Sequence, residues 1–222
     1  SERETVKVLR RRLFKRIDDV GAAEVAEAYR ALWMKHAADL PAQRVHDDRA
    51  GDLLEGYPFH PALMDVLTDK LATLANFQRV RGMLRLVTQE VAALWRERPA
   101  DTYAVHLHHL DPGYPPIRNE IVTRLELSAY DPAIRNDVSS GSGTSLAEQI
   151  DARHYAGMAP SGSFVARTIL WHSFALNPAL QGTNPEELRF AVLAPGLDLG
   201  FVNDARQRFV AESAYLDDRP TA

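Results

Sequence analysis

The chain has 222 residues, 45% of them hydrophobic and 25% charged, which is the composition of an ordinary soluble globular chain with one large domain or two small ones. Its net charge of −4 argues against a general polyanion binder, and the absence of cysteine excludes disulfides and thiolate metal sites and agrees with a reducing cytoplasm. No apolar run approaches the roughly 18 residues of a membrane span, so we expect no membrane contact.

The first hundred residues have the hydrophobic spacing of helices. This spacing predicts amphipathic helices over 2–17 and 22–38. A third helix is predicted to begin at Pro61, where the missing N–H of proline costs nothing. A fourth is predicted over 80–95, and its buried face is expected to consist of apolar residues three or four positions apart: Val80, Leu84, Val87 and Val91.

Shorter elements are expected in the next sixty residues. Alternation of polar and apolar residues over 103–110 predicts a short strand. Helices are expected over 117–127 and 131–138. The stretch 139–145 is rich in serine and glycine, which predicts a flexible loop.

A helix over 146–153 is predicted to follow this loop, with Thr144 or Ser145 as its cap and Glu148 in its first turn. The loop is not a P-loop, because no lysine follows Gly141-Ser142-Gly143, and the chain also lacks HExxH and GxSxG motifs. Nothing in the sequence therefore indicates a self-contained active site.

The last sixty residues have a different pattern. An apolar helix is predicted over 164–176, a strong helix start lies at 183–187, and a further helix is expected over 198–212. The segment 214–216 is predicted to be a strand. Three helices followed by a strand is the order of a winged helix that lacks its second wing strand, and it predicts a winged-helix-like module over 161–222.

Three of the eight histidines lie close together in the sequence. On a strand, His106 and His108 would share one face, with Asp111 nearby, which is the pattern of a metal site. No second cluster supplies distant ligands, and the other histidines are scattered, so a polar strand edge or loop is the favoured interpretation. We expect no metal.

Basic residues gather in two places. Residues 1–20 hold seven basic side chains, a pattern typical of a solvated helix surface and also compatible with a face for nucleic acid or an acidic partner. In the final helix, four polar residues have the order of a recognition helix, although acidic residues that repel phosphate surround them: Asn203, Arg206, Gln207 and Arg208.

The fourth helix carries a pair of arginines one turn apart. At about 100° per residue, Arg81 and Arg85 project together roughly 100–140° away from the predicted buried face. Such a pair is a permanently charged fork suited to phosphate oxygens. The alternative is two ordinary surface arginines.

The motif Gly56-Tyr57-Pro58-Phe59-His60-Pro61, followed by Asn76-Phe77-Gln78-Arg79-Val80-Arg81-Gly82-Met83-Leu84-Arg85-Leu86, resembles a family of large bacterial AAA+-type ATPases. These are described mainly as a domain of unknown function and are often encoded beside DNA methylases in phage-defence loci. Family members carry a similar pattern in the helical lid that follows the nucleotide-binding core. Residues 10–14 are similar to the entry into that lid, and residues 164–216 more loosely resemble the segment after it.

This resemblance implies roles for three arginines. Arg85, which follows Gly82, corresponds to the sensor-2 residue that reaches the γ-phosphate, and Arg81 and Arg79 are secondary candidates for the nucleotide or a neighbouring subunit. ATP and Mg²⁺ are implied for the full-length parent. Both Walker motifs are missing here, so we expect a fragment that neither binds ATP tightly nor hydrolyses it alone.

Together these observations predict a mainly α fold with three parts: a lid-like domain over 1–98, a connecting segment over 99–160 and the winged-helix-like module over 161–222. The expected partners are the upstream nucleotide-binding core and a DNA molecule or defence-system protein, with homo-oligomerisation left open. The predicted function is to sense bound ATP and to couple that state to the partner. The alternative is a non-enzymatic winged-helix module that binds DNA or protein.

Overall fold

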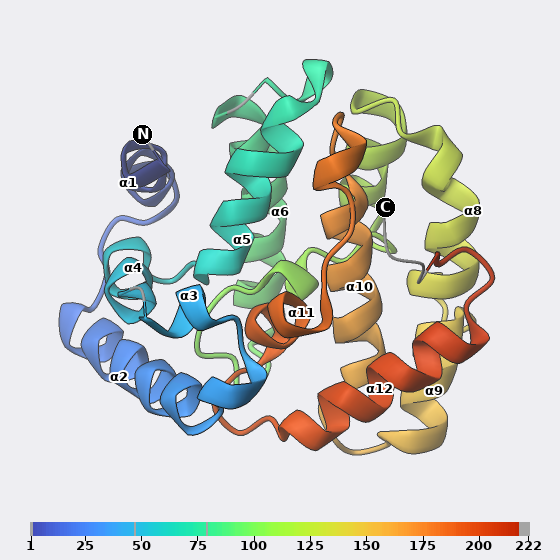
Figure 1. The fold of residues 1–222 in the computed structure, drawn as a ribbon. Helices are drawn as coiled ribbons and strands as arrows, with labels where there is room; N and C mark the ends of the chain where they lie inside the picture. The colour runs from blue at the N-terminus through green and yellow to red at the C-terminus, as the bar shows by residue number, and fades with distance from the viewer. Residues whose placement is uncertain (1, 47, 79, 218–222) are drawn as a thin grey trace.

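The structure is a computed structural model that describes residues 2–46, 48–78 and 80–217. Within these ranges the chain is helical, and its one β element is an isolated parallel bridge between Phe59 and Val105 (Figure 1). The predicted mainly α fold is therefore confirmed. Among the described residues, no helix has the length and apolar character needed to cross a membrane.

The described residues of the first half of the chain form six α-helices. In the view of Figure 1, α1, α2 and α4 lie to the left of α5, and α4 contacts both α1 and α2. The four helices predicted in this half are present with shifted ends, and α5 continues through a π turn and a 3₁₀ turn to Thr73. The bounds are α1 Glu2–Leu13, α2 Asp19–Lys35, α3 Ala42–His46, α4 Arg49–Gly56, α5 Pro61–Asp65 and α6 Val80–Glu97.

The buried face of α6 differs from the predicted one. Val80, Leu84 and Val91 are only half-buried, while the fully buried positions are Gly82, Met83, Leu86, Val87 and Glu90. The reason lies at Gly82, where a Cβ atom would stand 1.9 Å from the carbonyl oxygen of Phe77. Because glycine has no side chain, the buried Phe77 can approach α6 at Gly82. The side of the helix that carries Gly82, Met83 and Leu86 therefore faces the core.

The second half of the chain is arranged around α10. This helix contacts α9, α11 and α12, and Figure 1 shows α12 crossing its lower end. The predicted cap of α9 is confirmed: Ser145 and Glu148 form a reciprocal capping box. The bounds are α7 Pro115–Asn119, α8 Asp131–Ala133, α9 Leu146–His154, α10 Ser161–Ser173, α11 Pro185–Val192 and α12 Leu199–Glu212.

Both predicted strands are wrong. In 103–110 only Val105 pairs with another segment, and the chain then makes a 3₁₀ turn over Leu107–His109. At 214–216 the backbone bends, because the N–H groups of Ala214 and Tyr215 donate to the carboxylate of Asp137 instead of to a neighbouring strand. The winged-helix geometry predicted for 161–222 is therefore not confirmed.

One continuous apolar core runs through all three predicted parts of the chain. Trp33 of α2 packs on Phe190 of α11, with ring centroids 5.0 Å apart. Beside this contact, Arg44 bridges Asp65 and Glu187 at 2.8 and 3.2 Å. The predicted boundaries at 98 and 160 stay predictions, and the helices on either side of them share this core.

Candidate functional site

Three histidines form a stack in the interior of the molecule, and a fourth packs against it. The bridge between Phe59 and Val105 aligns two segments distant in sequence, and it places His60 against His106 with ring centroids 4.2 Å apart. His106 in turn stacks on His108 at 4.9 Å, and His108 stacks on Phe164 at 3.8 Å. His109 packs edge-on against His108. The sequence alone left His60 among the scattered histidines.

Hydrogen bonds fix the protonation of the central ring. Ala191 offers a carbonyl oxygen 2.8 Å from Nδ1 of His106, so Nδ1 donates and Nε2 accepts from the Tyr29 hydroxyl at 2.6 Å. Burial lowers the pKa of His106 to about 4. Burial, followed by the neighbouring histidines and arginines, holds the pKa values of His60 and His108 well below their ordinary range. The stack is neutral at physiological pH.

This arrangement does not make a metal centre. Both ring nitrogens of His106 are already bonded, and Nδ1 of His109 accepts from the backbone N–H of His106. No group of three or more potential ligands converges among the residues that the structure describes. The faces of His106 and His108 are covered by their stacking partners, and the two side chains are 1% and 2% exposed.

A cavity of about 870 Å³ opens beside the stack. Its floor includes the buried side chains of His106, His108 and Glu90, and its rim includes the exposed Met158 and Phe201. The cavity therefore leads from the surface to buried polar groups. Its size lies within the range of about 300–1,000 Å³ that is usual for small-molecule sites.

Glu90 is the most unusual group on this floor. Its side chain belongs to α6, is 2% exposed and makes no hydrogen bond or ion pair with any described residue. Burial raises the pKa of its carboxyl to about 9, with a smaller opposing effect of Arg167. Sequence reasoning missed this residue, although its position seven residues after Met83 places it on the apolar face of α6.

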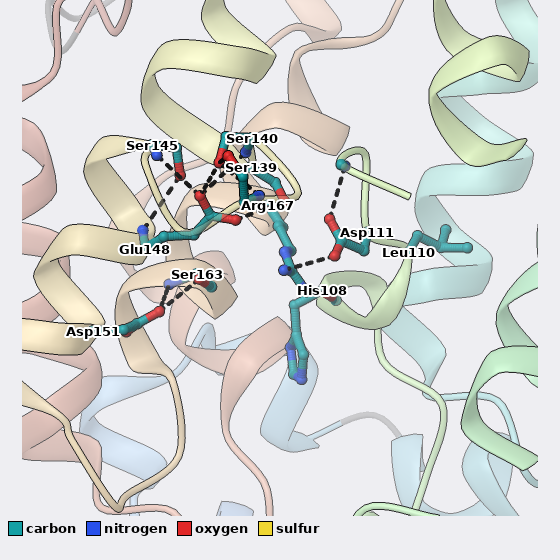
Figure 2. A network of polar contacts seen from close by, with 12 residues as sticks. His108, Leu110, Asp111, Ser139, Ser140, Ser145, Glu148, Asp151, Ser163 and Arg167 are labelled. Atoms are coloured by element: carbon teal, nitrogen blue, oxygen red, sulfur yellow. Dashed lines mark hydrogen bonds and ion pairs between the residues drawn. The ribbon is translucent and has the colours of Figure 1, made fainter. Parts of the chain in front are cut away.

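Arg167 also lines the cavity but is engaged by other groups. Its Nη2 donates to Asp111 at 2.9 Å, and Figure 2 shows the guanidinium pointing toward that carboxylate. Its Nε is buried and has no hydrogen-bond partner, and the same is true of Nδ1 of His108. The floor thus contains unsatisfied polar atoms next to a neutral carboxyl group.

The Ser/Gly loop beside this region is hydrogen-bonded to an acidic side chain, while its predicted flexibility stays a prediction. Glu148 accepts from the backbone N–H groups of Ser140 and Ser145 and from the Ser140 hydroxyl (Figure 2). Asp151 likewise accepts from Gly162 and Ser163 at the start of α10. The donors that a phosphate cradle would need are already used inside the protein.

The arginines singled out in the sequence lie on another face of α6. Arg85 donates through Nε to Glu120 at 2.6 Å, and Glu120 also pairs with Arg124 at 3.3 Å. Arg81, one turn earlier, is exposed. Arg79 lies outside the described residues.

The four polar residues of the predicted recognition helix lie on α12. Arg208 pairs with Asp204 at 2.8 Å, and Asn203 accepts from Arg189 at 2.8 Å. Arg206 is half-buried and Gln207 is exposed. Arg208, Asn203 and also Arg206 are therefore engaged within the protein.

Comparison with known proteins places the chain in a family. No curated protein and no solved structure matches it. The family model described as DUF499 second domain matches residues 1–184, which include the arginine face of α6 and most of the cavity lining. The match covers well over half of the chain, which therefore belongs to the DUF499 family, as its second domain.

Proposed function

We propose that this chain is the helical lid, with its following segment, of a larger AAA+-type ATPase, and that α6 presents arginines to a nucleotide held by a separate P-loop core. Two findings support the proposal: the likeness of residues 56–86 to the lid motif of such ATPases, and membership of the DUF499 family. The single observation that carries it is the arrangement of Arg85.

Arg85 is oriented and still accessible. Glu120, whose side chain is 8% exposed, holds Arg85 through Nε, which fixes the direction of the guanidinium. The two Nη atoms of Arg85 make no hydrogen bond to any described residue, and the side chain is 26% exposed. A guanidinium that is anchored on one edge and open on the other suits a phosphate oxygen pair.

The difference in burial among the residues of the 56–86 motif supports the same proposal. Phe59, His60, Phe77 and Gly82 are buried and shape the fold, whereas Arg81 is exposed and Arg85 is partly so. ATP and its Mg²⁺ would be held by the core and supply the phosphoryl chemistry. Arg85 and Arg81 would bind the phosphate end, and the packing of Met83 and Leu86 would transmit the resulting shift of α6 to the rest of the lid.

The test uses the longer protein that carries the core. Arg85→Ala is expected to lower the ATPase kcat by about tenfold or more, because a charged contact to the transferring phosphate is lost. Arg124→Ala is the matched control, since Arg124 pairs with the same carboxylate but is 57% exposed and lies off α6. Its turnover is expected to stay within about twofold of the wild type.

Two further results bear on the proposal. Arg85→Lys keeps a positive charge beside Glu120 but removes the planar guanidinium. If this variant has the melting temperature of the wild type and a low ATPase turnover, the result supports a contact between Arg85 and the nucleotide. Unchanged turnover in Arg85→Ala contradicts the sensor role. A full reading frame without a P-loop contradicts the proposal as a whole.

The alternative, a non-enzymatic module that binds DNA or protein through residues 161–222, stays a prediction. The structure supports this alternative less than the lid proposal, because Arg208 on α12 is already paired with Asp204. A titration with duplex DNA at rising salt tests it, because phosphate contacts must weaken steeply as salt increases. Absence of binding at low salt contradicts the DNA-binding form of this alternative.

A further inference from the structure

The cavity beside the histidine stack has the features of a binding site that the proposed lid function does not use. Its lining includes the buried carboxyl of Glu90, which makes no hydrogen bond or ion pair with any described residue, and two buried nitrogens without a partner, Nδ1 of His108 and Nε of Arg167. Similar unpartnered nitrogens occur away from the cavity, at His60 and His172 among others. Those at the cavity differ in lying beside a buried carboxyl and an opening through which a ligand can enter.

The charges around the cavity favour a cation. Arg167 is neutralised by Asp111 at 2.9 Å, and this pair leaves the carboxyl of Glu90 without a counter-ion. Five acidic side chains and two basic ones line the cavity: Glu90, Glu97, Asp101, Asp111 and Asp198 against Arg96 and Arg167. An anionic ligand would meet this excess of carboxylates, so the lining selects against it.

The shape of the walls favours a flat ligand. Phe164 is covered on one face by His108 at 3.8 Å, and it lines the cavity together with three aromatic side chains that are exposed or half-buried: Tyr103, Tyr114 and Phe201. Because the histidines are neutral, their rings do not repel a positive charge. Aromatic walls beside a carboxylate are the combination that binds planar delocalised cations, through the ring faces and a bidentate ion pair.

We propose that this cavity binds a planar organic cation of the guanidinium or amidinium class, with Glu90 as its carboxylate partner and the aromatic side chains as its walls. Such a cation is either the head group of a free small molecule or an arginine side chain of a polypeptide. Both sources share the same chemistry at Glu90.

Binding is coupled to a proton. Without a ligand, the carboxyl of Glu90 keeps its proton at pH 7.5, because burial raises its pKa to about 9. The charged groups that face it are Arg167 on α10, Asp111 after the 3₁₀ turn and Glu97 on α6. An incoming cation favours the carboxylate, so the O–H bond of Glu90 breaks and the proton passes to the buffer.

The experiment compares three isosteric probes on this chain by isothermal titration calorimetry: benzamidinium, neutral benzamide and anionic benzoate. We expect benzamidinium to bind at least about tenfold more tightly than the other two. Titrations at pH 7.5 in two buffers of different ionisation enthalpy are expected to show release of close to one proton per bound benzamidinium. Nα-acetyl-arginine amide serves as the fourth probe, and tighter binding of it than of benzamidinium identifies a polypeptide source.

Two variants complete the test. Glu90→Gln is expected to weaken the binding of benzamidinium by about tenfold or more and to abolish the proton release, while the affinity for benzamide stays unchanged. Glu24→Gln, on the exposed side of α2, is the control and is expected to change nothing. Equal binding of benzamide and benzamidinium, tighter binding of benzoate, or no binding of any cation at 10 mM overturns the proposal.

Discussion

Replacing Glu90 with glutamine is expected to stabilise the protein, and the gain is expected to grow with pH. The carboxyl lies on α6 at 2% exposure, without a hydrogen bond or ion pair to any described residue. Burial raises its pKa from 4.5 to about 9 in the folded chain. Between these two values the folded state holds a proton that the unfolded state releases, so wild-type stability falls as pH rises.

The magnitude follows from the displacement of the pKa. Each pH unit inside this window costs the wild type about 1.4 kcal/mol, which gives roughly 0.8 kcal/mol at pH 5 and roughly 3.4 kcal/mol at pH 7. Glutamine has nearly the shape of the protonated acid and does not titrate. The difference in unfolding free energy between variant and wild type should therefore rise by about 2.5 kcal/mol from pH 5 to pH 7.

Urea unfolding at pH 5, 6, 7 and 8, followed by circular dichroism, measures this difference at each pH. The histidines and all other groups titrate equally in both proteins and cancel. Glu24→Gln provides the control, since that carboxyl is exposed on α2 and its replacement should leave the difference flat. A flat difference for Glu90→Gln would refute the reasoning, because it would mean that the carboxyl is ionised in the folded chain.

Three other outcomes are expected. Acid should destabilise the wild type below about pH 6.5, because burial lowers the pKa values of His60, His106 and His108 in the folded state and the unfolded chain therefore binds more protons. With its pKa at about 4, His106 contributes about 2 kcal/mol of this loss by pH 5, and the loss is measurable as a falling urea midpoint. Gly82→Ala should cost about 1–3 kcal/mol in the same assay, because the new Cβ meets the Phe77 carbonyl oxygen. Asp137→Ala should raise the hydrogen-exchange rates of the amides of residues 214 and 215 far more than those of α10, because its carboxylate accepts both N–H groups.

Helix positions were predictable because their signals are local. Pro61 begins α5, and Ser145 with Glu148 caps α9 as expected. The strand at 103–110 was predicted wrongly. Alternation of polar and apolar residues implies a strand with one solvent-exposed face, whereas residues 104–108 are all buried. Other parts of the chain cover this segment on every side, and a segment buried on all sides has no regular alternation of polar and apolar residues from which its structure could be predicted.

The site was harder to predict than the fold because it depends on contacts between distant segments. Forty-five residues separate His60 from Val105, and only the bridge beside them brings His60 onto His106. Glu90 did carry a local signal, since its spacing from Met83 and Leu86 places a carboxyl on an apolar helix face. Glu90 was missed because the predicted buried face was centred on Val80 and Leu84, which placed Glu90 outside that face.

Hydrogen bonding differs along the histidine stack: Nε2 of His60 and Nδ1 of His108 have no partner, whereas both nitrogens of His106 are bonded, and His106 and His108 line the cavity. His106 has both ring nitrogens bonded, to Tyr29 and Ala191, which is what a structural core residue requires. Nδ1 of His108 and Nε of Arg167 are unsatisfied, and these two residues line the cavity together with the unpaired Glu90. Packing alone would select apolar side chains at such positions, because burying a polar group without a partner destabilises the fold. The group that sets the cavity apart from other buried polar positions is Glu90, a buried carboxyl without a hydrogen bond or ion pair to any described residue, and a cationic ligand in the cavity would give it a partner.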